Sequence, residues 1–246
     1  MLRDIRVGDS TGASRWSVAA VILDLDGTLV DTLGDFEVAL NRMLAELALP
    51  PVDRGFIERT VGKGSEHLIR SVLAEQLRRL DPSACDSHCP AAQPEARYER
   101  AWQSYQAHYL AINGDFADVY PGVTEGLHAL KAAGLPLACL TNKPRAFATG
   151  LLRAKGLDGF FGHVFGGDSF ERRKPDPLPL LRTCEALGTS PSLTLMVGDS
   201  QNDARAARAA GCPVALVSYG YNHGQPIHQV DADAHMDRLD QLRVVA

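Results

Sequence analysis

Two aspartates near the start of the chain, Asp24 and Asp26, are the residues best placed to do chemistry. They follow residues 18–23, an apolar run typical of a buried parallel strand. Side chains two positions apart in an extended segment project to the same side. Both carboxylates should therefore meet just past the strand's carboxyl end, where open α/β sheets bind ligands. Close carboxylates repel each other unless a cation or a proton lies between them. Taken alone, the pair would also fit a solvated turn.

A second acidic pair follows residues 193–197, another apolar run. Asp199 stands at the predicted strand end, and Asp203 lies one helical turn further on. An acid at the start of a helix is often only a partner of the helix dipole. Beside Asp24 and Asp26, however, Asp199 would complete an all-oxygen site. Hard oxygen ligands with room for water suit Mg²⁺ better than zinc.

Two further strand ends carry groups that bind anions. Thr141 and Asn142 follow the apolar residues 136–140 at the start of a predicted helix. A hydroxyl and free backbone amides can hold an anion there, although the same dipeptide is also a common helix cap. Lys174 follows a short strand predicted at residues 164–165. Its ammonium would relieve the repulsion between nearby carboxylates and hold a phosphoryl oxygen.

The order of these segments predicts an α/β fold built on a doubly wound parallel sheet. Short apolar strands alternate with helices from residue 121 onward, and the strand at residues 18–23 fits the same pattern. Strands are expected at residues 18–23, 136–140, 164–165, 193–197 and 214–217. Glycines are expected to end the helices between them, at Gly134, Gly156, Gly188 and Gly211.

Residues 33–114 differ from the rest because their pattern is helical throughout. Apolar side chains recur at helical spacing in three stretches: Phe36, Leu40, Met43, Leu44 and Leu47; Leu68, Ile69, Val72, Leu73 and Leu77; and Tyr98, Trp102, Tyr105 and Tyr109. An aromatic stripe of the third kind is more often the core of a bundle than a ligand site. We interpret this segment as an all-helical cap inserted over the strand ends of a core formed by residues 18–32 and 115–246.

Composition limits the possible partners. The 246 residues are 45% hydrophobic, which is enough for a sizeable core. The net charge of −5 gives no electrostatic reason to expect nucleic acid or an anionic membrane as a partner. Apolar runs fall far short of the roughly 20 residues of a membrane-spanning helix. Residues 1–17 lack the apolar centre of a secretory signal, and we expect them to form a poorly ordered extension.

Cysteine usage points to a reducing compartment. The five cysteines are odd in number and mostly lie in apolar segments, as reduced core residues of a cytoplasmic protein would. Residues 81–94, rich in Pro, Ser, Ala and Cys, predict a surface loop. Within it, Cys85, His88 and Cys89 have no second pair at a suitable spacing, which favours a plain loop over a zinc site.

Taken in order, four motifs resemble the haloacid dehalogenase superfamily of phosphatases. They are the D-x-D-G-T of residues 24–28, a strand ending in Thr141, an isolated Lys174-Pro175, and the G-D-S-x-x-D of residues 198–203. The resemblance spans residues 18–231, and the inserted helical segment is similar to the first cap type of that superfamily. Each motif alone is weakly specific, whereas four in order at strand ends are far more so.

This resemblance implies a role for each residue. Asp24 would be the nucleophile that forms an aspartyl phosphate, and Asp26 would protonate the leaving oxygen and then deprotonate water. Mg²⁺ would be held by Asp24, the backbone carbonyl of Asp26, and Asp199, with Asp203 acting through water or behind the direct ligands. The groups implied to bind the transferring phosphoryl oxygens are Thr141, the Asn142 amide and Lys174.

Within the superfamily, two stretches are similar to bacterial phosphoglycolate phosphatases. Residues 61–64 (Val-Gly-Lys-Gly) resemble the substrate-specificity loop of that family, although Asn often stands there in place of Lys63, and residues 219–227 resemble its Y-G-Y-N-x-G stretch. The functional interpretation is that cap closure brings Lys63, with Gly64 and His67, to the carboxylate of a small phosphorylated acid. A solvated loop lysine is an equally good interpretation, and a Schiff-base lysine like that of phosphonoacetaldehyde hydrolases is a remote one.

We therefore predict a cytoplasmic, Mg²⁺-dependent phosphomonoester hydrolase, monomeric or homodimeric, without a nucleic-acid or membrane partner. Its expected substrate is a small phosphorylated metabolite, foremost 2-phosphoglycolate. A sugar-phosphate phosphatase or a phosphosugar mutase of the β-phosphoglucomutase kind remain alternatives, and a catalytically silent binding protein is a remote one. Dehalogenation is disfavoured, because those relatives lack the second acid that Asp26 supplies. A P-type pump would require membrane segments.

Overall fold

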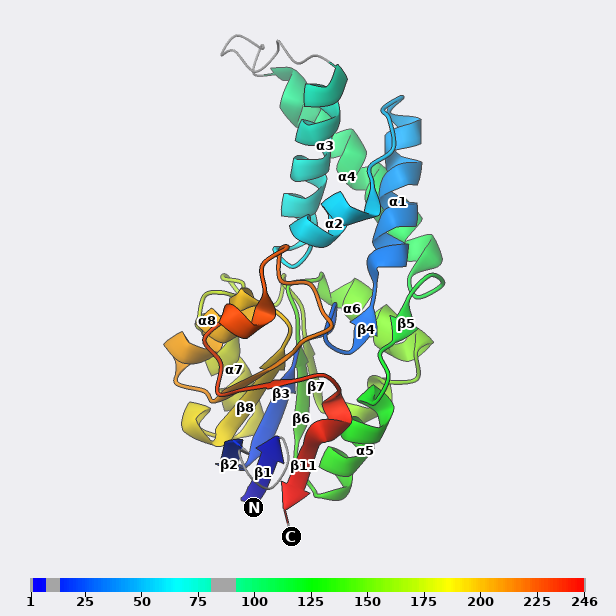
Figure 1. The fold of residues 1–246 in the computed structure, drawn as a ribbon. Helices are drawn as coiled ribbons and strands as arrows, with labels where there is room; N and C mark the ends of the chain where they lie inside the picture. The colour runs from blue at the N-terminus through cyan, green and yellow to red at the C-terminus, as the bar shows by residue number, and fades with distance from the viewer. Residues whose placement is uncertain (1, 8–13, 81–91, 246) are drawn as a thin grey trace.

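A six-stranded parallel sheet forms the centre of the computed structural model, which describes residues 2–7, 14–80 and 92–245 (Figure 1). The strand order is β10-β9-β8-β3-β6-β7, and every neighbouring pair is parallel. The doubly wound sheet is as predicted, and five of its strands lie where they were expected; β10 is additional. The strands are β3 (Ala20–Leu23), β6 (Leu137–Leu140), β7 (His163–Phe165), β8 (Thr194–Gly198), β9 (Val214–Val217) and β10 (Ala234–Met236).

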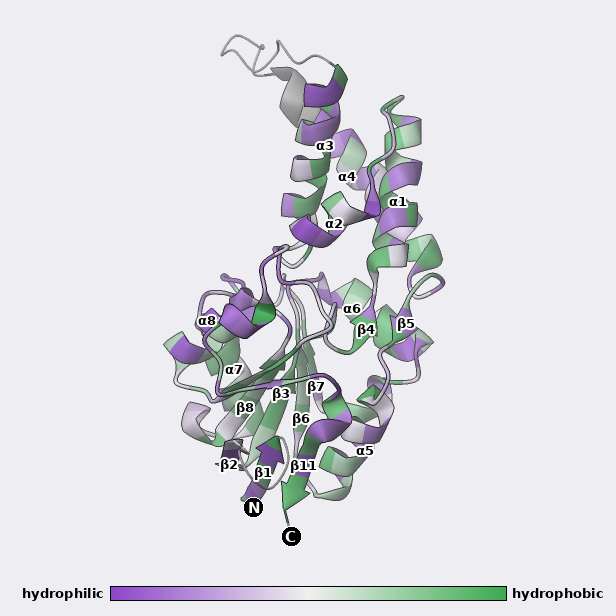
Figure 2. Cartoon of the chain, in the orientation of Figure 1, coloured by the Kyte–Doolittle hydropathy of each residue, from purple (hydrophilic) through white to green (hydrophobic). Residues whose placement is uncertain are grey.

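Helices cover both faces of this sheet, and each face has its own apolar cluster. On β3, Val21 and Leu23 join the cluster under one pair of helices, whereas Ile22 joins the cluster under the other pair. Alternate side chains of a strand project to opposite faces, so a strand covered on both sides reads as a continuous apolar run. Figure 2 shows these hydrophobic strands inside a more polar shell. The first pair is α5 (Val123–Ala132) and α6 (Arg145–Ala154); the second is α7 (Leu178–Leu187) and α8 (Gln201–Ala210).

The predicted helix stops are confirmed. All four glycines have the positive φ that suits a residue just past a helix: Gly134, Gly156, Gly188 and Gly211. Short 3₁₀ turns complete the connections at Asp158–Phe160, Pro191–Leu193, Ile227–Gln229 and Leu239–Gln241.

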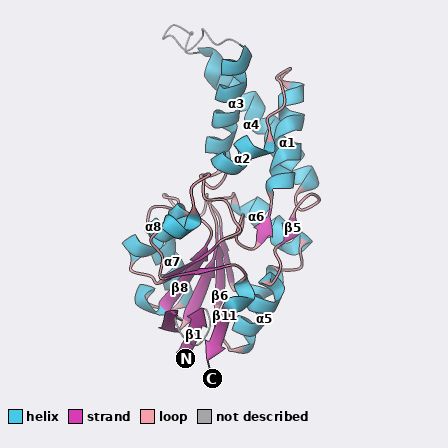
Figure 3. Ribbon diagram, in the orientation of Figure 1, coloured by secondary structure: helices cyan, strands magenta, loops and turns pink. Residues whose placement is uncertain are grey.

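A layer of helices stands over one end of the sheet (Figure 3). It consists of α1 (Leu33–Glu46), α2 (Arg54–Thr60), α3 (Ser65–Leu80) and α4 (Ala92–Ile112), and we call it the cap. The three predicted stripes lie on α1, α3 and α4, and the short α2 is additional. The cap has a separate apolar cluster, which also takes in two residues from the sheet side, Phe147 and Tyr221. The cap and the sheet therefore share a packed interface.

Two extended segments connect the sheet to the cap and pair with each other. They are β4 (Val30–Asp31) and β5 (Asp118–Val119), which run antiparallel. Close to them, the buried carboxylate of Asp35 accepts hydrogen bonds from the backbone N–H groups of Gly114 and Phe116, at 2.7 and 2.9 Å. Burial raises the pKa of Asp35. These contacts tie the start of the cap to its end. The division of the chain into a cap of residues 33–114 and a core remains a prediction.

The expectation that residues 1–17 form a poorly ordered extension is wrong for residues 3–7 and 14–17, which lie in strands. Strand β1 (Arg3–Val7) lies between β2 (Ser14–Val18) and β11 (Leu242–Val245) and pairs with both in a three-stranded antiparallel sheet. Ile5 and Val7 are buried in the main core. One of the two strands that pair with β1 is the distant β11, so no local pattern of the sequence predicts that pairing. Residues 81–91 of the predicted loop, with Cys85, His88 and Cys89, lie outside the described residues, and its last residues, 92–94, belong to α4 instead of a loop.

Candidate active site

Three carboxylates from different segments meet at one edge of the parallel sheet. Asp24 follows β3, Asp199 follows β8, and Asp203 lies in the first turn of α8. One carboxylate oxygen from each lies within 4.8 Å of the other two. The carboxyl ends of parallel strands share one edge of the sheet, which is why residues so distant in sequence converge here.

Lys174 supplies positive charge inside this cluster. Its ammonium lies 3.0 Å from a carboxylate oxygen of Asp24 and 2.7 Å from Oδ1 of Asp203, and it donates a hydrogen bond to the Leu140 carbonyl at 2.7 Å. Burial alone would lower the pKa of Lys174, but the carboxylates of Asp203 and Asp24 outweigh it and raise the pKa above its usual value. The lysine is therefore held charged between two acids.

One ammonium does not neutralise three carboxylates. Burial raises the pKa of Asp24 to about 7, against the opposing effect of Lys174. Burial, together with the charges of Asp203 and Asp24, raises the pKa of Asp199 well above its usual value. The carboxylate cluster is therefore buried, offers only oxygen ligands and lacks enough positive charge to balance its acids. These properties fit a hard divalent cation.

Two glycines allow the backbone to approach Asp199 closely. A Cβ at Gly27, where φ is +80°, would lie 2.1 Å from Oδ2 of Asp199, and a Cβ at Gly220 would lie 2.3 Å from its Cβ. In the space so left, Oδ2 accepts a hydrogen bond from the backbone N–H of Tyr221 at 2.6 Å, and Oδ1 accepts one from the Thr28 hydroxyl at 3.1 Å. These bonds fix the orientation of the Asp199 carboxylate.

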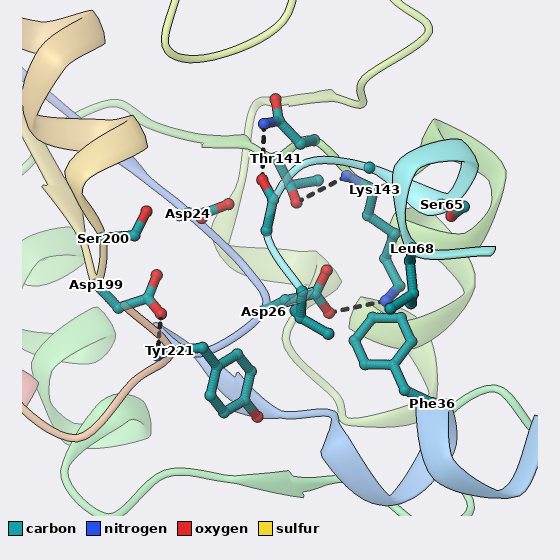
Figure 4. Close-up of a pocket in the computed structure, with 14 residues that line it drawn as sticks. Asp24, Asp26, Phe36, Ser65, Leu68, Thr141, Lys143, Asp199, Ser200 and Tyr221 are labelled. Atoms are coloured by element: carbon teal, nitrogen blue, oxygen red, sulfur yellow. Dashed lines mark hydrogen bonds and ion pairs between the residues drawn. The ribbon is translucent and has the colours of Figure 1, made fainter. Parts of the chain in front are cut away.

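Asp26 faces the same cavity but has its own cation. Its Oδ1 accepts a hydrogen bond from the Thr32 hydroxyl at 2.8 Å. It accepts another from the ammonium of Lys143 at 2.7 Å, which Figure 4 shows. Sequence reasoning assigned no role to Lys143. Its position in the sequence could have indicated a role, because it directly follows Thr141 and Asn142, which were predicted to bind an anion.

Thr141 and Asn142 also line the cavity. The side-chain amide of Asn142 donates to the carbonyls of Gly62 and Lys174, at 2.9 and 2.8 Å, and its Oδ1 accepts from the Lys174 N–H at 3.1 Å. Asn202 donates to the same Gly62 carbonyl at 3.2 Å. The two asparagines thus hold the cap loop against the sheet.

The cap closes the cavity from above, but not with all the residues expected. Gly64 lines the cavity, whereas Lys63 and His67 are exposed and are not part of its lining. Partial burial, with a smaller contribution from the charge of Lys63, lowers the pKa of His67. The empty space in and around this cavity is about 490 Å³, a figure that includes open solvent. Its lining is Asp24, Asp26, Phe36, Val61, Gly62, Gly64, Ser65, Leu68, Thr141, Asn142, Lys143, Asp199, Ser200 and Tyr221.

The site is a cavity with carboxylates at its centre, and comparison with known proteins gives the family. The family model for haloacid dehalogenase-like hydrolases matches residues 18–211. The chain therefore belongs to the haloacid dehalogenase-like hydrolases. Relatives 42 and 44% identical over most of the chain are phosphatases, and this chain is a phosphatase as well.

Individual relatives agree with this assignment. The chain is 42% identical over 229 residues to a phosphoglycolate phosphatase of Thiobacillus denitrificans, covering 93% of this chain and 95% of that protein. It is 44% identical over 222 residues to one of Nitrosospira multiformis, covering 90% and 92%. A crystal structure of a predicted phosphoglycolate phosphatase from Haemophilus somnus superposes with a TM-score of 0.83 at 32% identity, covering 91% of this chain and 95% of that chain.

Among the described residues, no helix combines the length and the apolar character needed to cross a membrane.

Proposed function

We propose that this protein hydrolyses 2-phosphoglycolate with Mg²⁺ through an aspartyl phosphate on Asp24. The observation that carries the proposal is the cluster of Asp24, Asp199 and Asp203 around Lys174, with Asp26 as a second acid on the same cavity. The relatives named phosphoglycolate phosphatase support the substrate. The buried cysteines Cys139, Cys184 and Cys212 are free, which supports the proposed cytoplasmic location.

In the first step, an Asp24 oxygen bonds to phosphorus while the bond from phosphorus to the ester oxygen breaks. The departing oxygen takes a proton from Asp26. Lys174, Thr141 and the backbone amide of Asn142 would hold the oxygens of the transferring phosphoryl group. In the second step, water attacks the phosphorus as Asp26 takes its proton. Phosphate leaves, and Asp24 is free again.

The contacts of Asp26 suit its proposed role, in which it donates a proton to the leaving oxygen and then accepts one from water. Thr32 and Lys143 both bond to Oδ1. No bond to Oδ2 is found among the described residues, so this oxygen is left to exchange a proton with the substrate. The proposed Mg²⁺ ligands are Asp24, the backbone carbonyl of Asp26, and Asp199.

When bound there, Mg²⁺ would neutralise charge on the reacting groups. Asp203 stands behind these ligands in our proposal. Its Oδ1 already bonds to Lys174, and its Oδ2 accepts from the Ser200 hydroxyl at 2.8 Å.

The test is the value of kcat/KM with Mg²⁺ for 2-phosphoglycolate against a panel of sugar phosphates, with Asp24→Asn as the inactive control. A preference of 100-fold or more, about 2.7 kcal/mol in transition-state binding, is expected. A flat profile or a peak on a sugar phosphate would overturn the substrate and keep the phosphatase.

A second variant tests whether Asp26 transfers protons and does not bind Mg²⁺ through its side chain. Asp26→Asn should lower kcat severely while Mg²⁺ binding, measured by calorimetry, stays close to wild type. Loss of Mg²⁺ affinity equal to that of Asp199→Asn would contradict the role of Asp26 as a proton carrier.

A further inference from the structure

We propose that Lys143, a residue of the sheet side, holds the carboxylate of the substrate, and that Lys63 of the cap does not. This inference rests on the proposed function, because it assumes that the substrate is a small phosphorylated acid. It reverses the expectation drawn from the sequence, which assigned that contact to the cap loop.

The first argument is the composition of the cavity wall. Lys143 is the only lysine, arginine or histidine among the described residues that line the cavity. Its side chain is 2% exposed, so its ammonium is shielded from bulk water. Figure 4 shows it reaching under the cap toward Asp26, beside Phe36 and Leu68. Lys174 is assigned to the phosphoryl group and already contacts two acids, so Lys143 is the basic side chain of the lining left for a second anionic group.

The second argument is the length of the substrate. In 2-phosphoglycolate, one methylene separates the ester oxygen from the carboxylate carbon. The ester oxygen must approach Asp26, because Asp26 is the proposed proton donor. The ammonium of Lys143 lies 2.7 Å from Asp26. A carboxylate one methylene away from the ester oxygen therefore falls within reach of Lys143.

The third argument is the bonding capacity left on the ammonium. A lysine ammonium has three N–H donors, and the bond to Asp26 uses one. The rings of Phe36 and Tyr109 lie 4.4 and 4.7 Å from Nζ, where they stabilise the positive charge without using a strong acceptor. Donors thus remain for a second carboxylate.

The cap adds to the same subsite through its backbone. The sixteen-residue helix α3 begins at Ser65, and Ser65 and Gly64 form part of the cavity wall. The positive end of a helix dipole favours an anion near its first turn. Lys143 from below and the start of α3 from above therefore create a place for one negative group between the sheet and the cap.

Lys63 lacks this position. It is exposed, and it is not part of the cavity lining although both neighbouring glycines are. It therefore serves as a matched control for the removal of one lysine charge near the site.

The experiment compares two substrates that share the phosphate, the ester oxygen and the methylene. One is 2-phosphoglycolate, and the other is 2-hydroxyethyl phosphate, in which a hydroxymethyl group replaces the carboxylate. The readout is the ratio of their kcat/KM values in wild type, Lys143→Met and Lys63→Met. A hydrogen bond to a charged group contributes about 1.5–3 kcal/mol. We therefore expect Lys143→Met to lower the ratio by about 10- to 150-fold, mainly through KM for 2-phosphoglycolate, while Lys63→Met leaves it within about 2-fold.

Each alternative has a distinct signature. Equal losses on both substrates in Lys143→Met would mean that Lys143 acts only through Asp26, and would overturn the proposal. If the ratio falls in Lys63→Met instead, the substrate carboxylate contacts Lys63 of the cap, and the proposal is overturned. Wild-type protein that does not prefer 2-phosphoglycolate would overturn the proposed substrate itself, and this role with it. Lys143→Gln, checked for native circular dichroism, replaces Lys143→Met if the methionine variant does not fold.

Discussion

Replacing Lys174 with methionine should destabilise the protein strongly, because one ammonium separates two buried acids. Its nitrogen lies 3.0 Å from Asp24 and 2.7 Å from Asp203, and its side chain is 2% exposed. Coulomb's law with an effective dielectric constant of about 20 gives roughly 5–6 kcal/mol for each contact, much of it offset by the cost of burying the charges. Removing one partner of a buried pair costs about 3–5 kcal/mol. Since two partners lose their cation here, we expect about 4–5 kcal/mol at pH 8.

The loss should depend on pH in a definite direction. Burial already raises the pKa of Asp24 to about 7 while Lys174 opposes the shift. Without the ammonium, the pKa of Asp24 in the folded variant rises further above its value in the unfolded chain. The folded variant then binds a proton more tightly than the unfolded chain does, so its stability recovers as the pH falls. The loss should therefore be smaller at pH 5.5 than at pH 8, and Mg²⁺ at pH 8 should stabilise the variant more than the wild type.

Urea unfolding followed by circular dichroism, at both pH values and with or without Mg²⁺, measures these differences. Lys131→Met is the matched control, because Lys131 is exposed on α5 and its removal should cost little. A loss below about 1 kcal/mol for Lys174→Met at pH 8 would refute the reasoning, as would a loss that is the same at both pH values.

Three further outcomes follow from the same cluster. In metal-free wild type, the free energy of unfolding should fall as the pH rises from about 4 to 7, because folded Asp24 keeps a proton that the unfolded chain has released. The fall should be at most about 1.4 kcal/mol per pH unit for Asp24. Urea midpoints measured in EDTA check this, and a rise in stability with pH would contradict it. Asp24→Asn should flatten that slope and lower kcat by about 10⁴-fold or more; turnover within 10-fold of wild type would exclude Asp24 as the nucleophile. Gly27→Ala should cost more stability and more activity than Gly134→Ala. Both glycines have φ near +80°, but only a Cβ at Gly27 would meet a carboxylate oxygen of Asp199. Equal costs in urea titrations and initial rates would show that the contact is unimportant.

Features that depend on the pattern of neighbouring residues were predictable from the sequence. The apolar runs located five strands of the parallel sheet, and strand ends must share an edge of such a sheet, so Asp24 and Asp199 could be expected to lie close together. The positive φ of Gly188 and Gly211 follows from their position just past a helix. These inferences need only the period of the side chains and the geometry of one element.

Contacts between distant segments were not predictable in this way. Strand β1 pairs with β2 and with β11, and a five-residue strand of mixed polarity carries no local signal of the distant partner β11. Lys143 and Lys63 are both lysines beside a motif. Only the packing of the cap against the sheet decides that the first is buried in the cavity and that the second points to solvent.

The pairing of β1 with β11 also imposes an order on folding. β2 lies close to β1 in the sequence, whereas the other partner, β11, lies far along the chain. Ile5 and Val7 belong to the main core, so their side chains stay unburied until that core has formed. Pairings between such distant residues slow folding, because a long loop must close before the contact stabilises the chain. Addition of β11, which completes this small sheet, is therefore expected among the last events of folding.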